Sequence, residues 1–412
     1  MTKFTKLMGA TAMALTMGGA AFADGHGCTA EGRVSILSND FAAVNAVSAG
    51  AAECAGADVS TNATTEHRDI QVAALTANPA EYTVAVVANS SIVALLNEGL
   101  IRPLDDLIAA HAPDIPMNQR ITVDGQVVAI AFMANAQHLF YRSDVLEAAG
   151  VAPPTTYEEV LAAAEAIRSQ GLMENPFITN TAVGWNLGEE FVNMYLGHGG
   201  SFFEAGSANP SINNETGVAT LEMMKALAEY SDPDFLTFAS NETAAEWEAG
   251  NAALGFMWGS RGGPILDDEG STEEVTSTTV LIGAPTVAGG DLPASTLWWD
   301  GFTIASNISD EDAEASFIAM VHGMRDEVVQ ANNDAAVWLS PAYEPGPAAA
   351  GVAATAASGT KPYPMIPFMG LMHTALGNEL AEFMQGEESA EQALADVEAA
   401  YITAATEQGF IE

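Results

Sequence analysis

The amino-acid sequence predicts an α/β protein of two lobes, and three observations lead to that prediction. Buried strands alternate with amphipathic helices along the first hundred residues, a pattern typical of a parallel sheet covered by helices. The chain has 412 residues, more than one hydrophobic core ordinarily supports. A tight-turn signal at Asp124-Gly125 then opens a second series of strands and helices.

The first series begins with a strand over 33–38 (RVSILS) and an apolar-periodic helix over 41–53. A short strand at 57–60 precedes a helix over 67–76, and another strand spans 82–87. Strands that alternate with helices in this way pair in parallel, so we expect their carboxyl ends at one edge of the sheet.

Polar residues follow these strands. In open parallel sheets, ligands bind beyond the carboxyl ends of the strands. The loops at those ends contain Asn39, Asp40, Glu66, Asn89 and Ser90, which are candidate ligand contacts on topology alone. The alternative for each residue is a helix cap or a solvated turn.

The second series contains strands at 126–132 and 139–142 and then becomes mainly helical. Three helix starts carry a hydroxyl residue three positions before an acidic or amide residue, which is the pattern of an N-terminal cap. The pairs are Thr156 with Glu159, Ser309 with Asp312, and Ser389 with Gln392. These residues are expected to be structural.

The N-terminal segment predicts export. Lys3 and Lys6 precede an apolar run over 7–20, and Ala21-Phe22-Ala23 has the small-x-small pattern that signal peptidase cleaves. The apolar run is too short to span a bilayer. We therefore expect residues 1–23 to be a signal peptide cleaved after Ala23, and the mature protein to be periplasmic.

Composition restricts the partners. The chain has 12 basic and 54 acidic residues and a formal net charge of −42. Nucleic acid is excluded as a partner, because a polyanion needs a basic footprint. The acidic surface fits either solubility in salty surroundings or attraction of a cationic ligand. Cys28 and Cys54, the two cysteines, fit a structural disulfide in an oxidising compartment, and neither a metal nor a cofactor is expected.

Several stretches, in a fixed order along the chain, resemble the family 1 extracellular solute-binding proteins of bacterial ABC importers. The matching stretches are 95–107 (LLNEGLIRPLDDL), 123–132, 140–159, 247–257 (WEAGNAALGFM) and 301–322. The resemblance rests on the number of collinear stretches and extends over nearly all of the chain after residue 23.

This resemblance implies a type II periplasmic binding protein fold, in which two α/β lobes joined by crossing segments close around a ligand. The N-terminal lobe would contain residues 24–132 and 292–340, and the C-terminal lobe residues 133–291 and 341–412. The resemblance also implies that a sugar or polyol is bound in the cleft and delivered to the transmembrane subunits of an ABC permease. We expect the protein to be a monomer.

A sugar presents apolar C–H faces and a rim of hydroxyls, so its pocket needs flat aromatic surfaces and a few fixed polar groups. Trp185, Trp258 and the pair Trp298-Trp299 supply such surfaces near the expected cleft. Asn135 lies at the expected crossing and is a further candidate contact. Packing in a core or between the lobes is the alternative role for these tryptophans.

The resemblance adds polar candidates. In relatives, the segments matching 257–261 and 298–301 commonly reach the ligand, which extends that role to Trp258, Arg261, Trp299 and Asp300. Arg261 and Asp300 would clamp hydroxyls, or they would pair with each other.

Two other functions are open. A cationic solute such as a betaine or polyamine would fit tryptophans beside carboxylates. A secreted glycoside hydrolase would use two carboxylates, for which Asp40 and Asp300 are candidates. The G-x-S-x-G and HExxH motifs are absent from the sequence, and the collinear resemblance favours binding without catalysis.

Overall fold

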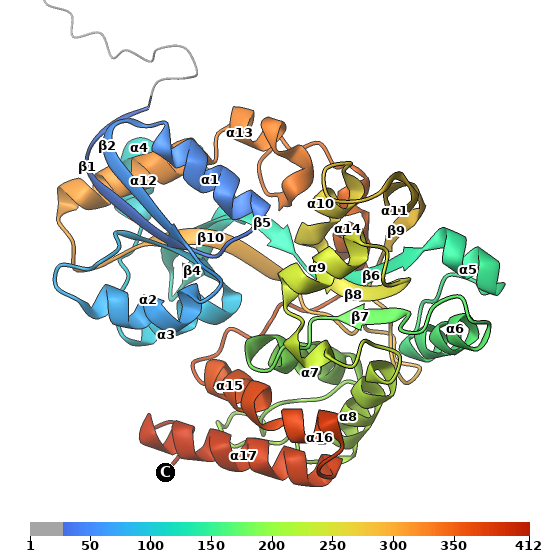
Figure 1. Cartoon of the computed structure of the whole chain (residues 1–412). Coiled ribbons are helices and arrows are strands. Elements are labelled where there is room, and N and C mark those ends of the chain that lie inside the picture. Colours follow the sequence, from blue (N-terminus) through green and yellow to red (C-terminus); the bar gives the residue numbers. More distant parts are fainter. Residues whose placement is uncertain (1–27) are drawn as a thin grey trace, which may run out of the picture.

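Two α/β lobes lie side by side in the computed structural model, which describes residues 28–412 (Figure 1). The expected signal peptide, residues 1–23, lies outside the described residues. Within residues 28–412, no helix is both long enough and apolar enough to cross a bilayer.

The first lobe is built on a seven-stranded sheet in the order β11-β5-β10-β3-β1-β2, with β4 paired to β5. Its strands are β1 (Thr29–Ser38), β2 (Ala55–Ala63), β3 (Val84–Ala88), β4 (Arg120–Val123), β5 (Gln126–Asn135), β10 (Trp298–Ile304) and β11 (Val337–Trp338). β1 pairs in parallel with β2 and β3, as the alternating pattern predicts.

The other half of this sheet is antiparallel, so a wholly parallel sheet is the wrong expectation. β10 is antiparallel to both β3 and β5, and β4 and β11 are antiparallel to β5. The reason is connectivity. β4 and β5 form a hairpin through Asp124 and Gly125, whose φ angles are 49° and 82°, and β10 enters from the second lobe rather than through a helical crossover.

Helices cover both faces of the first sheet because side chains alternate along its buried strands. In β3, Val84 and Val86 pack with α1 and α12, whereas Ala85 and Val87 pack with α2 and α3. The helices of this lobe are α1 (Ala42–Ala52), α2 (His67–Thr76), α3 (Asn89–Asn97), α4 (Asp105–His111), α12 (Asp310–Gly323) and α13 (Asp326–Ala331).

The second lobe has a four-stranded sheet in the order β7-β8-β6-β9. Its strands are β6 (Gln137–Arg142), β7 (Phe177–Thr179), β8 (Leu254–Trp258) and β9 (Thr279–Ile282). Its helices are α5 (Ser143–Ala149), α6 (Tyr157–Ser169), α7 (Trp185–Gly197), α8 (Glu215–Ala228), α9 (Ser240–Glu248), α10 (Gly262–Leu266), α11 (Glu273–Thr278), α14 (Ala350–Ala357), α15 (Met369–Glu379), α16 (Ala381–Gln385) and α17 (Ala390–Glu407). The expected caps of α6, α12 and α17 are confirmed, because Thr156, Ser309 and Ser389 each accept the backbone N–H three residues on.

The chain passes between the two sheets three times: between Asn135 and Gln137, between Ile282 and Trp298, and after Trp338. The first two crossings lie side by side, because Trp298 of β10 pairs with Asn135 of β5 (Figure 1). The residue numbers at which one lobe ends and the other begins stay a prediction.

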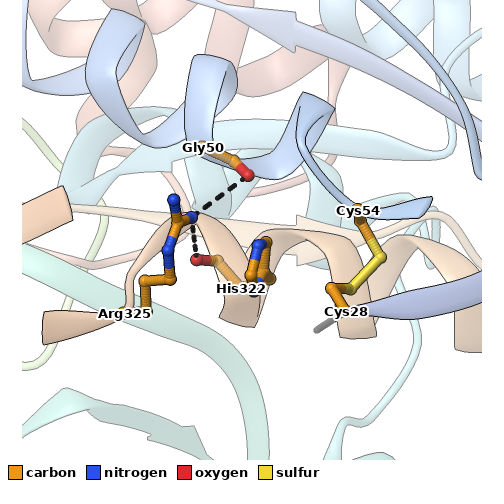
Figure 2. The surroundings of a disulfide bond; sticks show 5 residues. All are labelled: Cys28, Gly50, Cys54, His322 and Arg325. Carbon is orange, nitrogen blue, oxygen red and sulfur yellow. Dashed lines mark hydrogen bonds between the residues drawn. A yellow bond between two sulfur atoms is a disulfide. The ribbon is translucent and has the colours of Figure 1, made fainter. Parts of the chain in front are cut away.

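The expected disulfide between Cys28 and Cys54 is confirmed, with the two Cα atoms 4.6 Å apart. It joins the start of β1 to the residue before β2, just after α1 ends. Figure 2 shows Arg325 nearby, whose Nη1 donates to the carbonyls of Gly50 and His322 at the ends of α1 and α12. This corner of the first lobe is therefore fastened covalently and by hydrogen bonds to helix-terminal carbonyls.

Candidate functional site

A cavity of about 290 Å³ lies between the two lobes. The first lobe lines it with residues that follow the carboxyl ends of its parallel strands or end one of them: Asn39, Phe41, Thr65, Arg68 and Ala88. The second lobe contributes Trp185, Asn186, Ala239, Ser240, Asn241, Glu242, Trp258, Ser260 and Arg261, and the crossing strands contribute Asn135, Trp298 and Asp300. The expected cleft at the crossing is therefore present.

Trp185, Trp258 and Trp298 together form one side of this cavity, here called the aromatic wall. The ring centroids of Trp185 and Trp258 are 6.2 Å apart, with the planes stacked at 26°. Trp298 meets both rings edge to face, at 5.5 Å and 5.6 Å. The side chains of Trp258 and Trp298 are only 8% and 4% exposed and belong to the core of the second lobe. These two rings therefore pack in the core and also line the cavity.

A buried polar network holds Trp298 from behind. Its indole Nε1 donates to Thr296 Oγ1 at 2.7 Å and to Glu189 Oε1 at 3.1 Å. Burial raises the pKa of Glu189 well above its usual range, against the opposing effect of the hydrogen bonds from Thr296 and Trp298. Next to it, Gln137 Nε2 donates to Glu190, and burial raises the pKa of Glu190 to about 8.

Trp185 is held by its backbone. His373 Nε2 lies 2.8 Å from the Trp185 carbonyl oxygen, and the two rings stack at 4.9 Å. Tyr363 Oη lies 2.8 Å from His373 Nδ1. Burial lowers the pKa of His373 to about 4, so the imidazole is neutral, donates through Nε2 and accepts from Tyr363 through Nδ1. Hydrogen bonds within the protein therefore position both Trp298 and Trp185.

Arg68, Arg261 and Asp300 form a charged group at the cavity, here called the charged cluster. The Arg68 guanidinium lies 4.1 Å from the centroid of the Trp185 ring, and that of Arg261 lies 5.7 Å from the Phe41 ring. Burial lowers the pKa of both arginines, that of Arg261 to about 10. Guanidinium groups keep their proton in proteins, so both side chains are cations. Burial raises the pKa of Asp300 to about 6, against the opposing effect of the two arginines.

Seven of the residues proposed from the sequence line the cavity: Asn39, Asn135, Trp185, Trp258, Arg261, Trp298 and Asp300. Asn135 also binds across the lobes, since its Nδ2 donates to Ser260 Oγ and its Oδ1 accepts from the Ser260 N–H. Arg261 and Asp300 form no ion pair within the described chain, so the alternative of a direct pair is not what the structure has.

The other five proposed residues are absent from the cavity lining: Asp40, Glu66, Asn89, Ser90 and Trp299. Asn89 is a structural bridge, because its amide accepts from the Trp299 N–H and donates to the Leu297 carbonyl. Trp299 packs with the core on the α2–α3 side of the first sheet. Asp40 accepts from Asn45, and Glu66 precedes α2 with its side chain exposed. Their role as ligand contacts stays untested, and the structure gives no sign of it.

Arg68 is the main residue that the sequence reading missed. It occupies the first turn of α2, just beyond the carboxyl end of β2. The sequence did hold a signal for it. Only 12 residues of the chain are Lys or Arg, so a basic residue that follows a strand end is unusual here.

Across residues 28–412, no group of His, Cys, Asp or Glu side chains could hold a metal ion.

The two-lobed fold, with a cavity at the crossing of the lobes, is that of a periplasmic binding protein. Residues 52–323 match the family model described as bacterial extracellular solute-binding protein, and the chain belongs to that family. Binding rather than turnover is what this family does, in agreement with the expectation from the sequence.

A curated relative, a probable ABC transporter-binding protein of Deinococcus radiodurans, is 30% identical over 157 residues. That match spans 37% of this chain and 37% of the relative's length.

Similar solved structures include a solute-binding protein of Agrobacterium radiobacter K84 in complex with ribitol (TM-score 0.79, 20% identity, 91% of this chain and 99% of that chain). A protein of Agrobacterium vitis S4 with bound D-mannitol has a TM-score of 0.77 at 18% identity, covering 92% of this chain and 99% of that chain. A maltose-bound protein of T. maritima has a TM-score of 0.78 at 17% identity, covering 90% of this chain and 99% of that chain. At these identities the likeness shows the shared two-lobed fold.

Proposed function

We propose that this protein is the solute receptor of an ABC importer and captures a sugar or polyol in the cavity between its lobes. The aromatic wall carries the proposal, because three tryptophan rings beside fixed amides and hydroxyls match the C–H faces and hydroxyl rim of a carbohydrate. The ribitol, mannitol and maltose bound by proteins of the same fold support this solute class.

The size of the cavity favours a small solute. At about 290 Å³ it falls just below the roughly 300–1,000 Å³ that small-molecule sites occupy. A single sugar ring or an acyclic polyol therefore fits this form of the protein better than a long oligosaccharide.

Charge argues against a cationic solute such as a betaine or polyamine. The Arg68 guanidinium already lies over the Trp185 ring, and Arg261 adds a second cation to the same cavity. Trp299, which an aromatic cage would use, is absent from the cavity lining. A glycoside hydrolase with Asp40 and Asp300 as its acid pair is likewise disfavoured, because Asp40 does not line the cavity.

Transport requires export, closure and a permease. We propose that residues 1–23 are cleaved after Ala23, that the mature protein acts in the periplasm as a monomer, and that the closed form presents both lobes to the permease. The intact mass of the exported protein tests the cleavage site. Small-angle scattering with a proven solute tests closure, and an unchanged radius of gyration would contradict it.

The test of solute class is a thermal-shift screen on protein unfolded and refolded to remove retained ligand. The panel contains monosaccharides, disaccharides, polyols, betaines and polyamines. A solute at 1,000 times its Kd stabilises the folded state by about 4 kcal/mol, which raises Tm by several degrees. Hits confined to the cations would contradict the proposal.

A further inference from the structure

Two arginines at the cavity, Arg68 and Arg261, form no side-chain hydrogen bond or ion pair with the described residues, which distinguishes them from the other arginines of that part of the chain. Within residues 28–412, the other arginines donate at least one hydrogen bond to a carboxylate or a carbonyl. Arg68 and Arg261 donate none among the described residues, and the Nε atom of each is buried without a partner.

Both side chains are half-buried, and the Nε–H donor of each is cut off from water without an acceptor, which costs free energy. Ring stacking does not satisfy them. The Cζ atom of Arg68 lies over the Trp185 ring and that of Arg261 lies over the Phe41 ring, and an aromatic ring does not replace the oxygen acceptors that guanidinium N–H donors require. The donors of both side chains are therefore free for a group that enters the cavity.

No carboxylate of the described chain pairs with either arginine. Asp300 is the one carboxylate of the lining that is not exposed, and it faces both cations without an ion pair to either one. Glu242 also lines the cavity but is exposed, so solvent screens it. Asp40 and Glu248 attract Arg261 from outside the lining, and neither forms an ion pair with it among residues 28–412.

We infer that the solute is an anionic sugar or polyol derivative, whose carboxylate or phosphate oxygens bind Arg68 and Arg261 while its C–H face lies on the aromatic wall. This inference rests on the proposed function and specifies its solute. Guanidinium groups bind carboxylate and phosphate in the same forked geometry, and a neutral hydroxyl supplies no charge to balance two cations.

The test is calorimetric titration of refolded protein with matched pairs of solutes. D-glucuronate is paired with D-glucose, D-galacturonate with D-galactose, and D-gluconate with D-sorbitol, and phosphates of the same hexoses form a third arm. We expect the best anionic member to bind at least about tenfold tighter than its neutral partner, as one or two charge-assisted hydrogen bonds require. The acid and phosphate arms identify which oxyanion is preferred.

Substitutions of the two arginines test whether they cause the preference for the anionic solute. R68M and R261M keep much of the packing of the stem and remove the charge, and each should lower affinity for the anion by about 10- to 100-fold. Affinity for the neutral partner should change less. R68K and R261K, which retain a cation without the planar fork, should recover part of the loss. K361Q removes an exposed cation that does not line the cavity and serves as the matched control.

The possible results distinguish the failure of the anionic-solute inference from the failure of the proposed sugar-receptor function. Equal or tighter binding of the neutral partner would overturn the anionic solute and leave the sugar receptor standing. No binding by any sugar, sugar acid or sugar phosphate would overturn both. Equal losses in R68M and K361Q would show that general electrostatics, rather than the cavity arginines, determine the preference.

Discussion

The aromatic wall and the charged cluster line the same cavity, yet they differ in how completely the protein satisfies them. Trp298 donates its indole N–H to Thr296 and Glu189, and Trp185 is fixed by His373. Arg68 and Arg261 have ring contacts but no hydrogen bonds among the described residues. Protein groups hold the wall in place, whereas we infer that a bound solute supplies the partners of the charged cluster. Loss of the buried Trp298 should therefore lower stability, whereas changes to the cluster, or to the partly exposed ring of Trp185, should lower affinity.

The largest effect on stability is expected for W298A. The side chain is 4% exposed, and its loss removes core packing and leaves Glu189 without its indole donor. We expect the free energy of unfolding to fall by about 3–5 kcal/mol. Urea unfolding followed by circular dichroism measures the change. A loss below about 1 kcal/mol would mean that the wall is not part of the core.

Glu189 offers a matched pair of substitutions. E189Q keeps an oxygen that accepts from Trp298 and Thr296, and a neutral amide resembles the neutral acid that burial favours. E189L removes this shared acceptor, so Trp298 Nε1 keeps only Thr296 Oγ1 and Thr296 Oγ1 keeps only Asn193 Oδ1. Each lost hydrogen bond costs about 1 kcal/mol, so we expect E189L to be the less stable variant by about 1–2 kcal/mol in the same urea experiment. Equal losses in the two variants would show that volume, rather than hydrogen bonding, matters at this position.

Glu190 should make stability depend on pH. Its pKa rises from 4.5 to about 8 on folding, so the unfolded chain releases this proton at lower pH than the folded protein does. The contribution of Glu190 to stability is therefore full below about pH 4.5 and is lost as pH rises towards 8. The Tm of E190Q should fall less between pH 5 and pH 8 than the wild-type Tm. Parallel curves for the two proteins would contradict the shift.

The smallest effect on stability is expected for R68M in the ligand-free protein. No hydrogen bond is lost, and relief from burying a charge offsets the lost attraction to Asp300. We expect the free energy of unfolding to change by less than about 1 kcal/mol, which urea titration can establish. A loss comparable to that of W298A would remove the distinction between the wall and the cluster.

Local sequence signals predicted much of the fold. The predicted helix over 67–76 is α2, and the predicted caps at Thr156, Ser309 and Ser389 are present. Both were predictable because helical periodicity and capping depend on a few neighbouring residues. The antiparallel half of the first sheet was not predictable in this way. β10 joins it from the second lobe, a pairing that depends on residues more than 160 positions apart, such as Trp298 and Asn135.

The site was predicted only in part, because its residues meet through contacts between distant parts of the chain. Trp298 and Trp299 are adjacent in β10, so they point to opposite faces and only one lines the cavity, but sequence alone does not say which. Asn89 sits at a strand end as a ligand contact would, but its amide binds Leu297 and Trp299 instead. Arg68 was missed because a charged residue in a helix is usually solvated, and only the second lobe brings Trp185 against it.

The central claim is that the cavity between the lobes binds a sugar or polyol on the aromatic wall. The most direct measurement is calorimetric titration of wild type, W185A and K361Q with the best solute from the thermal-shift screen. W185A removes a partly exposed ring of the wall, so we predict that it folds and loses at least about tenfold in affinity, while K361Q binds as the wild type does. Unchanged affinity in W185A would contradict the claim and place the solute elsewhere.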